Sequence, residues 1–294
     1  MYCSVRDCMV AREEFSSPVE GMRHLGVDAV EIAISREFAV GAMDSKEMVT
    51  LQSDDDGRAY AKHLEDLGIR PVAFLTACDF SAGDSASNVQ WVARVLELAD
   101  LMGMPAIRID SAMQKERELD FETRVDLFAS NLKAVLERTA GSTVAMGIEN
   151  HGYQGNNLAF QLNVYKAVGS DRLGSTMDTG NFYWRGYPLS EVYGILNILA
   201  PYTKHTHLKN INYPEDTREV MREGGWEYGR YVSPLDEGDI DHAKVLRILA
   251  DAGYDGDICL EDESLGHYAE GQERIAVLER DVAHIKQIIK ALEN

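Results

Sequence analysis

Short apolar runs rich in β-branched residues alternate with helical patterns along the whole chain. The first run is followed by Ser17 and Pro18, a pair typical of a helix N-cap and its first helical position. The same order of strand and then helix repeats to the end of the chain. The predicted strands span residues 2–10, 29–35, 70–80, 105–111, 142–151, 172–181, 202–210 and 256–264.

Strands that alternate with helices pair in parallel, because each helical crossover returns the chain to the same end of the sheet. These units, with no break in composition, predict an α/β fold of the (β/α)8 TIM barrel class, built as one domain over residues 1–294. The alternative is an open doubly wound sheet. That fold favours a glycine-rich phosphate loop after the first strand, and residues 4–15 contain no glycine.

Functional side chains of such a barrel gather at the carboxyl ends of its strands. The last four predicted strands end in the segments GIENH, MDTGN, THLKN and CLEDES, which offer Glu149, Asp178, His207 and Glu261. Each residue alone is more typical of a helix cap or a loop, so the interpretation depends on their occurring together. Three carboxylates and one imidazole suit a hard or borderline divalent cation. We predict one such ion, Mn²⁺ in the first place, with Mg²⁺, Co²⁺ and Zn²⁺ as alternatives.

The seventh strand places His205, His207 and Lys209 at alternate positions. Because strand side chains alternate between the two faces, all three are expected to point at the barrel axis. Lys209, one layer above His207, is predicted to polarise a substrate carbonyl. His205 and His151 are expected to contact the substrate as further proton carriers.

Two other residues are candidates for substrate contact. Arg108 on the fourth strand either reaches a substrate hydroxyl or phosphate or pairs with Glu31 inside the barrel. Trp226 either stacks on an apolar sugar face or packs within its own loop. That loop, residues 211–241, is long enough to form a lid over the site, and a subunit contact is the alternative.

The charge balance narrows the class of partner. The 294 residues contain 29 Lys and Arg against 49 Asp and Glu, a formal net charge of -20. Such a field repels phosphate backbones and anionic membranes, so neither is an expected partner. Charged residues near the amino terminus interrupt what a secretory signal would need, and the four cysteines form no CxxC pair. We therefore expect a cytoplasmic protein with buried thiols.

Several motifs together resemble the xylose-isomerase-like TIM-barrel superfamily, the group of sugar phosphate isomerases and epimerases. They are GIENHG at 147–152, MDTGN at 177–181, HTHLKN at 205–210 and the tail at 234–263. The resemblance covers nearly the whole chain. It implies that Glu149, Asp178, His207 and Glu261 bind one divalent metal ion, and that Glu149 and Glu261 also act as acid and base.

Three positions depart from the ketose 3-epimerases of this superfamily. Gly155, Asn181 and Tyr213 stand where those enzymes carry a glutamate, a histidine and an arginine. Asn181 and His151 are therefore expected to contact a substrate of another kind. Endonuclease IV, a more distant member, needs histidines at the early strand ends, and only His24 and His63 precede the fifth strand here.

The expected function is that of a divalent-metal-dependent isomerase or epimerase of a sugar or sugar derivative. It would remove the proton next to a carbonyl through a metal-stabilised enediolate. One alternative is a lyase or dehydratase acting on a keto-sugar, a keto-inositol or a 3-keto-glycoside. Another is a carbohydrate-binding or partner subunit with a vestigial site, against which the complete set of ligand types argues. Self-association into a homo-oligomer is left open.

Overall fold

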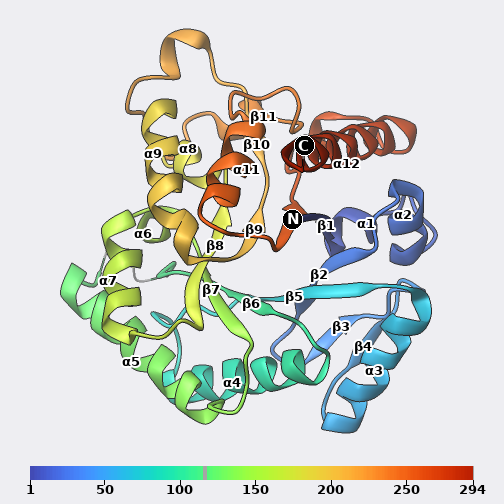
Figure 1. The fold of residues 1–294 in the computed structure, drawn as a ribbon, viewed down its shortest axis with the longest axis vertical. Helices are drawn as coiled ribbons and strands as arrows, with labels where there is room; N and C mark the ends of the chain where they lie inside the picture. Colours follow the sequence, from blue (N-terminus) through green and yellow to red (C-terminus); the bar gives the residue numbers. More distant parts are fainter. Residues whose placement is uncertain (115–117, 294) are drawn as a thin grey trace.

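Eight parallel strands form one sheet that curls into a barrel, with helices around its outside (Figure 1). A computed structural model describes residues 1–114 and 118–293. The strands of the barrel are β1 (Tyr2–Arg6), β2 (Ala29–Ile34), β5 (Arg70–Thr76), β6 (Ala106–Ile109), β7 (Ala145–Glu149), β8 (Leu173–Asp178), β9 (Thr203–His207) and β12 (Asp257–Leu260). The predicted (β/α)8 class is confirmed.

The barrel closes where β9 meets β12. A parallel bridge joins Leu208 to Leu260. The Leu208 amide donates to the Cys259 carbonyl oxygen at 2.8 Å, and the Glu261 amide donates to the Leu208 carbonyl oxygen at 3.0 Å. This bridge joins the two outer strands of the sheet, and it brings the end of the last strand beside the end of β9.

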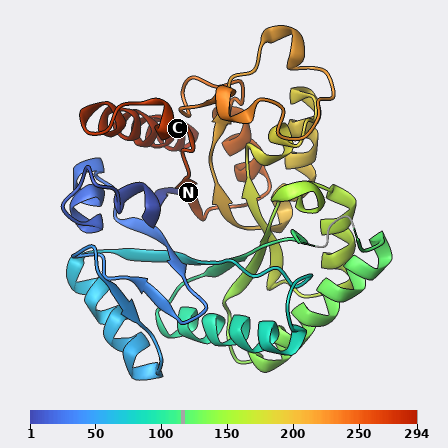
Figure 2. The same cartoon turned by 180° about the vertical axis from the view of Figure 1, so that it is seen from behind.

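Eight longer helices surround the strands, and Figure 2 shows the same ring from behind. They are α2 (Pro18–Leu25), α3 (Asp54–Leu67), α4 (Ser85–Leu101), α5 (Phe121–Arg138), α7 (Leu158–Val168), α9 (Leu189–Leu199), α11 (His242–Asp251) and α12 (Gln272–Leu292). The predicted cap at Ser17 is confirmed, because its side chain accepts from the Glu20 amide with Pro18 at the first helical position. None of these described helices combines the length and apolar character that crossing a membrane requires.

Shorter elements lie in the connections between the strands and the longer helices. Single helical turns are α1 (Asp7–Val10), α6 (Gly152–Gly155), α8 (Asn181–Trp184), α10 (Tyr228–Tyr231) and the 3-10 turns η1 (Ala200–Tyr202), η2 (Glu215–Thr217) and η3 (Ser264–His267). Two antiparallel hairpins are formed by β3 (Ala39–Gly41) with β4 (Met48–Thr50), and by β10 (Asn210–Ile211) with β11 (Val232–Ser233).

The predicted strand order is right, but several predicted ends are wrong. The first strand stops at Arg6 instead of continuing to residue 10, because the Asp7 carboxylate accepts a hydrogen bond from the Ala33 amide and the chain turns into α1. The hairpin of β3 and β4 has no counterpart in the prediction. Its residues lie mostly on the surface, with Met48 62% exposed, so they lack the apolar alternation of a buried strand.

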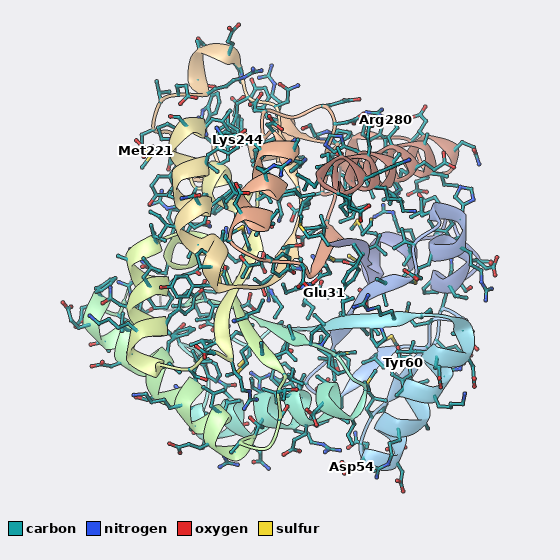
Figure 3. All side chains as sticks on the ribbon, in the orientation of Figure 1. Glu31, Asp54, Tyr60, Met221, Lys244 and Arg280 are labelled. Carbon is teal, nitrogen blue, oxygen red and sulfur yellow. The ribbon has the colours of Figure 1, made fainter. Side chains whose placement is uncertain are left out.

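Charged residues inside the barrel stand out against this apolar frame. Figure 3 shows Glu31 near the centre of the molecule, whereas Asp54 and Met221 lie at its periphery. Glu31 is 1% exposed although it is a carboxylate. A buried charge needs partners of opposite sign, and these lie toward the carboxyl end of the barrel.

Two paired glycines allow β8 to approach its neighbours closely. Gly147 of β7 lies opposite Gly174 of β8, and a Cβ at 174 would collide with the carbonyl oxygen of Tyr202.

We expect Gly174→Ala to lower the free energy of unfolding by about 2–3 kcal/mol, because overpacking here forces the backbone to move. Chemical denaturation measures this. The control is Gly194→Ala at an exposed position of α9, where a Cβ meets nothing within 4 Å and should stabilise by about 0.5–1 kcal/mol. Equal stabilities of the two variants would contradict the predicted overpacking.

Candidate metal centre

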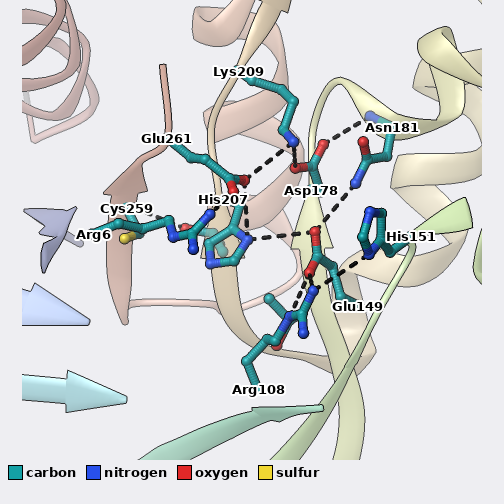
Figure 4. A network of polar contacts seen from close by, with 12 residues as sticks. Arg6, Arg108, Glu149, His151, Asp178, Asn181, His207, Lys209, Cys259 and Glu261 are labelled. Atoms are coloured by element: carbon teal, nitrogen blue, oxygen red, sulfur yellow. Dashed lines mark hydrogen bonds and ion pairs between the residues drawn. The ribbon is translucent and has the colours of Figure 1, made fainter. Parts of the chain in front are cut away.

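Four predicted ligands come together at the carboxyl end of the barrel (Figure 4). Glu149 ends β7, Asp178 ends β8, His207 ends β9 and Glu261 follows β12. One ligand atom from each lies within 4.8 Å of the others, and all four residues are buried. The sheet register explains this arrangement, because Asp178 lies opposite His207 and the bridge from Leu208 to Leu260 places Glu261 beside them.

Asp178 is held in place by its neighbours in the chain. Asn150 exchanges two hydrogen bonds with the Asp178 backbone, at 2.8 and 2.9 Å. The Asp178 Oδ1 atom accepts from the amides of Gly180 and Asn181, which begin α8. The other oxygen, Oδ2, accepts no hydrogen bond and faces the cluster.

His207 is oriented by Glu31, which lies in β2 across the barrel. Its Nε2 atom is 3.0 Å from both carboxylate oxygens of Glu31. This contact fixes the proton on Nε2 and directs Nδ1 toward Glu149 and Glu261, at 3.5 and 3.2 Å. Burial alone would lower the pKa of His207, but the carboxylates of Glu31, Glu261 and Glu149 raise it well above its usual value. The metal-free ring is therefore an imidazolium, and a metal ion would displace its Nδ1 proton.

The cluster fits a divalent cation. Asp178 Oδ2, Glu261 Oε2 and His207 Nδ1 are buried atoms with no hydrogen-bond partner, and they come from three different strand ends. The Lys209 ammonium lies 3.1 Å from Asp178 Oδ2 and 3.2 Å from Glu261 Oε2, where it supplies positive charge. Three carboxylates and an imidazole match the ligand preferences of Mn²⁺, Mg²⁺, Co²⁺ and Zn²⁺.

Two arginines bind the glutamate ligands from outside the cluster. Arg108 pairs with Glu149 and also with Asp110, and Arg6 pairs with Glu261 and Glu31. Burial raises the pKa of both ligand carboxyls, but Arg108 and His207 hold the pKa of Glu149 well below its usual range. Lys209 and His207 do the same for the pKa of Glu261. Both glutamates therefore stay ionised and ready to bind a cation.

Asp178 behaves differently because it lacks an arginine partner among the described residues. Burial raises its pKa to about 7, and the neighbouring carboxylates Glu261 and Glu149 add to the rise that Lys209 opposes. Cation binding at this centre should therefore release protons near neutral pH.

A second group of possible ligands lies deeper in the barrel and fits a metal less well. It consists of Glu31, His205, His207 and Cys259. The Glu31 carboxylate is already bound by both histidines and by Arg6. Burial raises the pKa of Cys259 well above its usual value, so its sulfur stays a protonated thiol.

Lys209 connects the cluster to the long loop above it. Its Nζ atom lies 2.7 Å from Glu263 Oε1, and the other oxygen of Glu263 accepts from the Tyr228 hydroxyl. Trp226 instead packs against Tyr213 and Tyr231, with ring centroids 5.8 and 5.7 Å away. Tyr213 and Tyr231 belong to the same loop, whereas Tyr228 reaches the Lys209 network through Glu263.

The remaining predicted residues fall at different levels. Asn181 Nδ2 donates to Glu149 Oε1 at 3.2 Å, beside the cluster. The His151 side chain is 44% exposed, with Nδ1 3.4 Å from Asp110 Oδ1. His205 was expected to contact substrate, but it is fully buried, with its two ring nitrogens 2.9 Å from Glu31 and 2.8 Å from Asp257. We correct that assignment, because His205 lies one layer below His207 and both nitrogens are engaged.

Sequence reasoning missed part of the support for the cluster. It did not assign a role to Arg6, Asp110 or Asp257. For Arg108 it offered substrate contact or pairing with Glu31, whereas the ion pairs of Arg108 are with Glu149 and Asp110. Arg6 is the last residue of the first strand, and this position at a carboxyl end of a barrel strand could have marked it as a site residue.

Close packing explains why position 155 is a glycine, where ketose 3-epimerases carry a glutamate. A Cβ at this position would lie 2.6 Å from Ser111 Oγ and 2.9 Å from the Glu149 carbonyl oxygen. The site therefore has no room here for the glutamate that ketose 3-epimerases carry.

Comparisons with known proteins agree with this architecture. The family described as xylose isomerase-like TIM barrel matches residues 19–288. Among solved structures, the IolI protein with a bound zinc atom is 15% identical, with a TM-score of 0.73 and coverage of 99% of each chain. L-ribulose 3-epimerase is 17% identical, with a TM-score of 0.69 over 99% of this chain and 95% of that one.

A third similar structure is the probable 3-DHS dehydratase AsbF, involved in petrobactin synthesis, from Bacillus anthracis. It is 16% identical, with a TM-score of 0.67 over 97% of this chain and 99% of that one. A search of curated protein sequences found no significant match. The structures are similar in fold, and the family match covers most of the sequence. The chain belongs to the xylose isomerase-like TIM-barrel family.

Proposed function

We propose that the protein is a divalent-metal-dependent enzyme that removes the proton next to a carbonyl of a sugar or sugar derivative, and so isomerises or epimerises it. The observation that carries this proposal is the set of buried ligand atoms on Asp178, His207 and Glu261 that meet beside Glu149 and, within the described chain, contact only one another, this glutamate and Lys209 by ion pairs. A bound cation supplies Lewis-acid stabilisation of the enediolate that proton removal creates. Mn²⁺ is our first choice of ion.

The protein's own groups suggest how the proton is handled. Glu149 and Glu261 were predicted to act as acid and base, but their cationic partners and lowered pKa values favour a ligand role. His151 is the better proton carrier, because its ring is partly open to solvent and the hydrogen bond to Asp110 raises its pKa. Lys209 donates to a substrate oxygen, and Asn181 orients Glu149.

A second candidate is a lyase or dehydratase on a related keto-sugar, keto-inositol or 3-keto-glycoside. The packing at Gly155 favours it, because the additional glutamate of the ketose 3-epimerases is excluded. Removal of one proton followed by loss of a β-hydroxyl needs an acid at the leaving oxygen, and Lys209 could supply it. The presence of both epimerases and dehydratases among the structural neighbours is compatible with either outcome.

We further propose that the enzyme is cytoplasmic and acts on a small molecule. The net charge of -20 disfavours nucleic acid and anionic membranes as partners. Its state of association does not enter the proposed chemistry.

The reaction is tested by adding Mn²⁺ to chelator-treated protein with a panel of ketoses in D₂O, and following the products by NMR. Metal-dependent deuterium incorporation without loss of water supports an isomerase or epimerase. Loss of water or of an aglycone supports the second candidate.

Metal binding should also stabilise the fold. At a metal concentration of a hundred times Kd, the free energy of unfolding should rise by about 2.7 kcal/mol. Unchanged melting after complete chelation and metal addition would contradict the metal centre.

The ligand assignment is tested by comparing two histidines two residues apart. His207→Ala should abolish Mn²⁺ binding in calorimetry, because it removes a ligand. His205→Ala should weaken binding by about 10–100-fold and leave it measurable, because it disturbs only the support of Glu31. Circular dichroism checks that both variants fold. Equal loss of metal in the two folded variants would place the cation lower in the barrel than we propose.

A further inference from the structure

A cavity lies beside the half of the barrel mouth that the metal ligands leave open. Its volume is about 440 Å³, and its lining comes from the segments that follow β2, β5 and β6. The proposed ligands come from β7, β8, β9 and β12. A substrate that binds the cation through two oxygens therefore has space to extend over the strands on this other side.

Asp110 joins the cavity to the metal centre. It lines the cavity, and its Oδ1 atom lies 2.8 Å from Arg108 and 3.4 Å from His151. Arg108 in turn pairs with the ligand Glu149. The cavity is thus separated from a proposed ligand by only two side chains, and it borders the proposed proton carrier.

The two acids of the cavity lining are each compensated by their own partners. Asp79 accepts four hydrogen bonds, two from Ser81 and one each from the amides of Met113 and Gln114. Asp110 pairs with Arg108, which it shares with Glu149. Both carboxylates are therefore engaged by donors of the protein, although Asp79 keeps its negative charge.

Arg36 is the cation of the lining, and it has no carboxylate partner within ion-pair distance among residues 1–114 and 118–293. Its Nη2 atom donates to Asn88 Oδ1, and its guanidinium lies 4.1 Å from the ring centroid of Trp91. Asn88 and Trp91 are buried residues of α4 that contact the guanidinium from one side, and Arg36 itself is exposed. An arginine held in this way and lacking a carboxylate partner is typical of sites for planar or tetrahedral anions.

We propose that this cavity binds the far end of the substrate and that Arg36 pairs there with an anionic group, a carboxylate or a phosphate. The substrate would then be an acidic sugar derivative rather than a neutral sugar. The inference rests on the proposed function for the position of the reacting carbonyl, but the anion site itself depends only on the cavity and its charges.

The test measures binding, so that it is independent of turnover. Calorimetry on the Mn²⁺-loaded protein compares fructose with fructose 6-phosphate and fructuronate, which carry at C6 a phosphate ester or, in place of the hydroxymethyl group, a carboxylate. We expect at least one charged probe to bind about tenfold more tightly than fructose. Arg36→Gln should bring that ratio to within about twofold. The two charged probes show which anion the site prefers.

The matched control is Arg94→Gln. Arg94 lies on the same helix as Asn88 and Trp91, but it already pairs with Asp54 and Glu97. Its substitution should leave the ratio unchanged. Equal binding of charged and neutral probes, no binding of either charged probe, or the same effect from both variants would overturn the proposal. Tight binding of a charged probe without any deuterium exchange would refute the proposed reaction and leave the anion site standing.

Discussion

The need to neutralise several carboxylates buried in one barrel shapes the whole site. Glu31, Glu149, Asp178 and Glu261 are nearly inaccessible to water. The last three lie at or just after the ends of β7, β8 and β12, and Glu31 lies within β2 across the barrel. Ionised groups in such a place are tolerated only when paired, since removing one partner leaves a buried charge that costs about 3–5 kcal/mol. Arg6, Arg108, Lys209 and the two histidines supply the compensating charge, from strands far apart in the sequence. Neutralisation therefore depends on closure of the barrel, and a bound cation would complete it.

This arrangement divides the barrel mouth into two halves with different tasks. One half contains the acidic ligands, which form ion pairs with Arg6, Arg108 and Lys209. The other half contains a cavity whose acids are internally satisfied and whose arginine has no carboxylate partner in the described part of the chain. The link from Asp110 to His151 and Arg108 runs along the boundary. Asp110, Arg108 and His151 therefore link the proposed metal centre to the proposed anion site around Arg36.

Sequence patterns were sufficient for the strand order and for the four clustered residues, because both follow from where strands end. Period-two alternation correctly placed His205, His207 and Lys209 toward the barrel axis, but it could not say that His205 lies below the reach of a substrate. The pairing of Arg6 with Glu261 joins residues 255 positions apart, and such a contact leaves no periodic trace. The same holds for Arg36 and Trp91, whose stacking depends on how a loop after β2 meets α4. Local rules find which residues face inward, whereas their partners emerge only when the barrel closes.

The central claim is that the four clustered side chains hold one divalent cation. It is tested most directly by anomalous X-ray diffraction from crystals grown with Mn²⁺, measured on either side of the manganese absorption edge. We predict an anomalous peak within coordination distance of carboxylate oxygens of Glu149, Asp178 and Glu261 and of Nδ1 of His207. A peak between Glu31, His205 and Cys259, or no peak inside the barrel, would contradict this account.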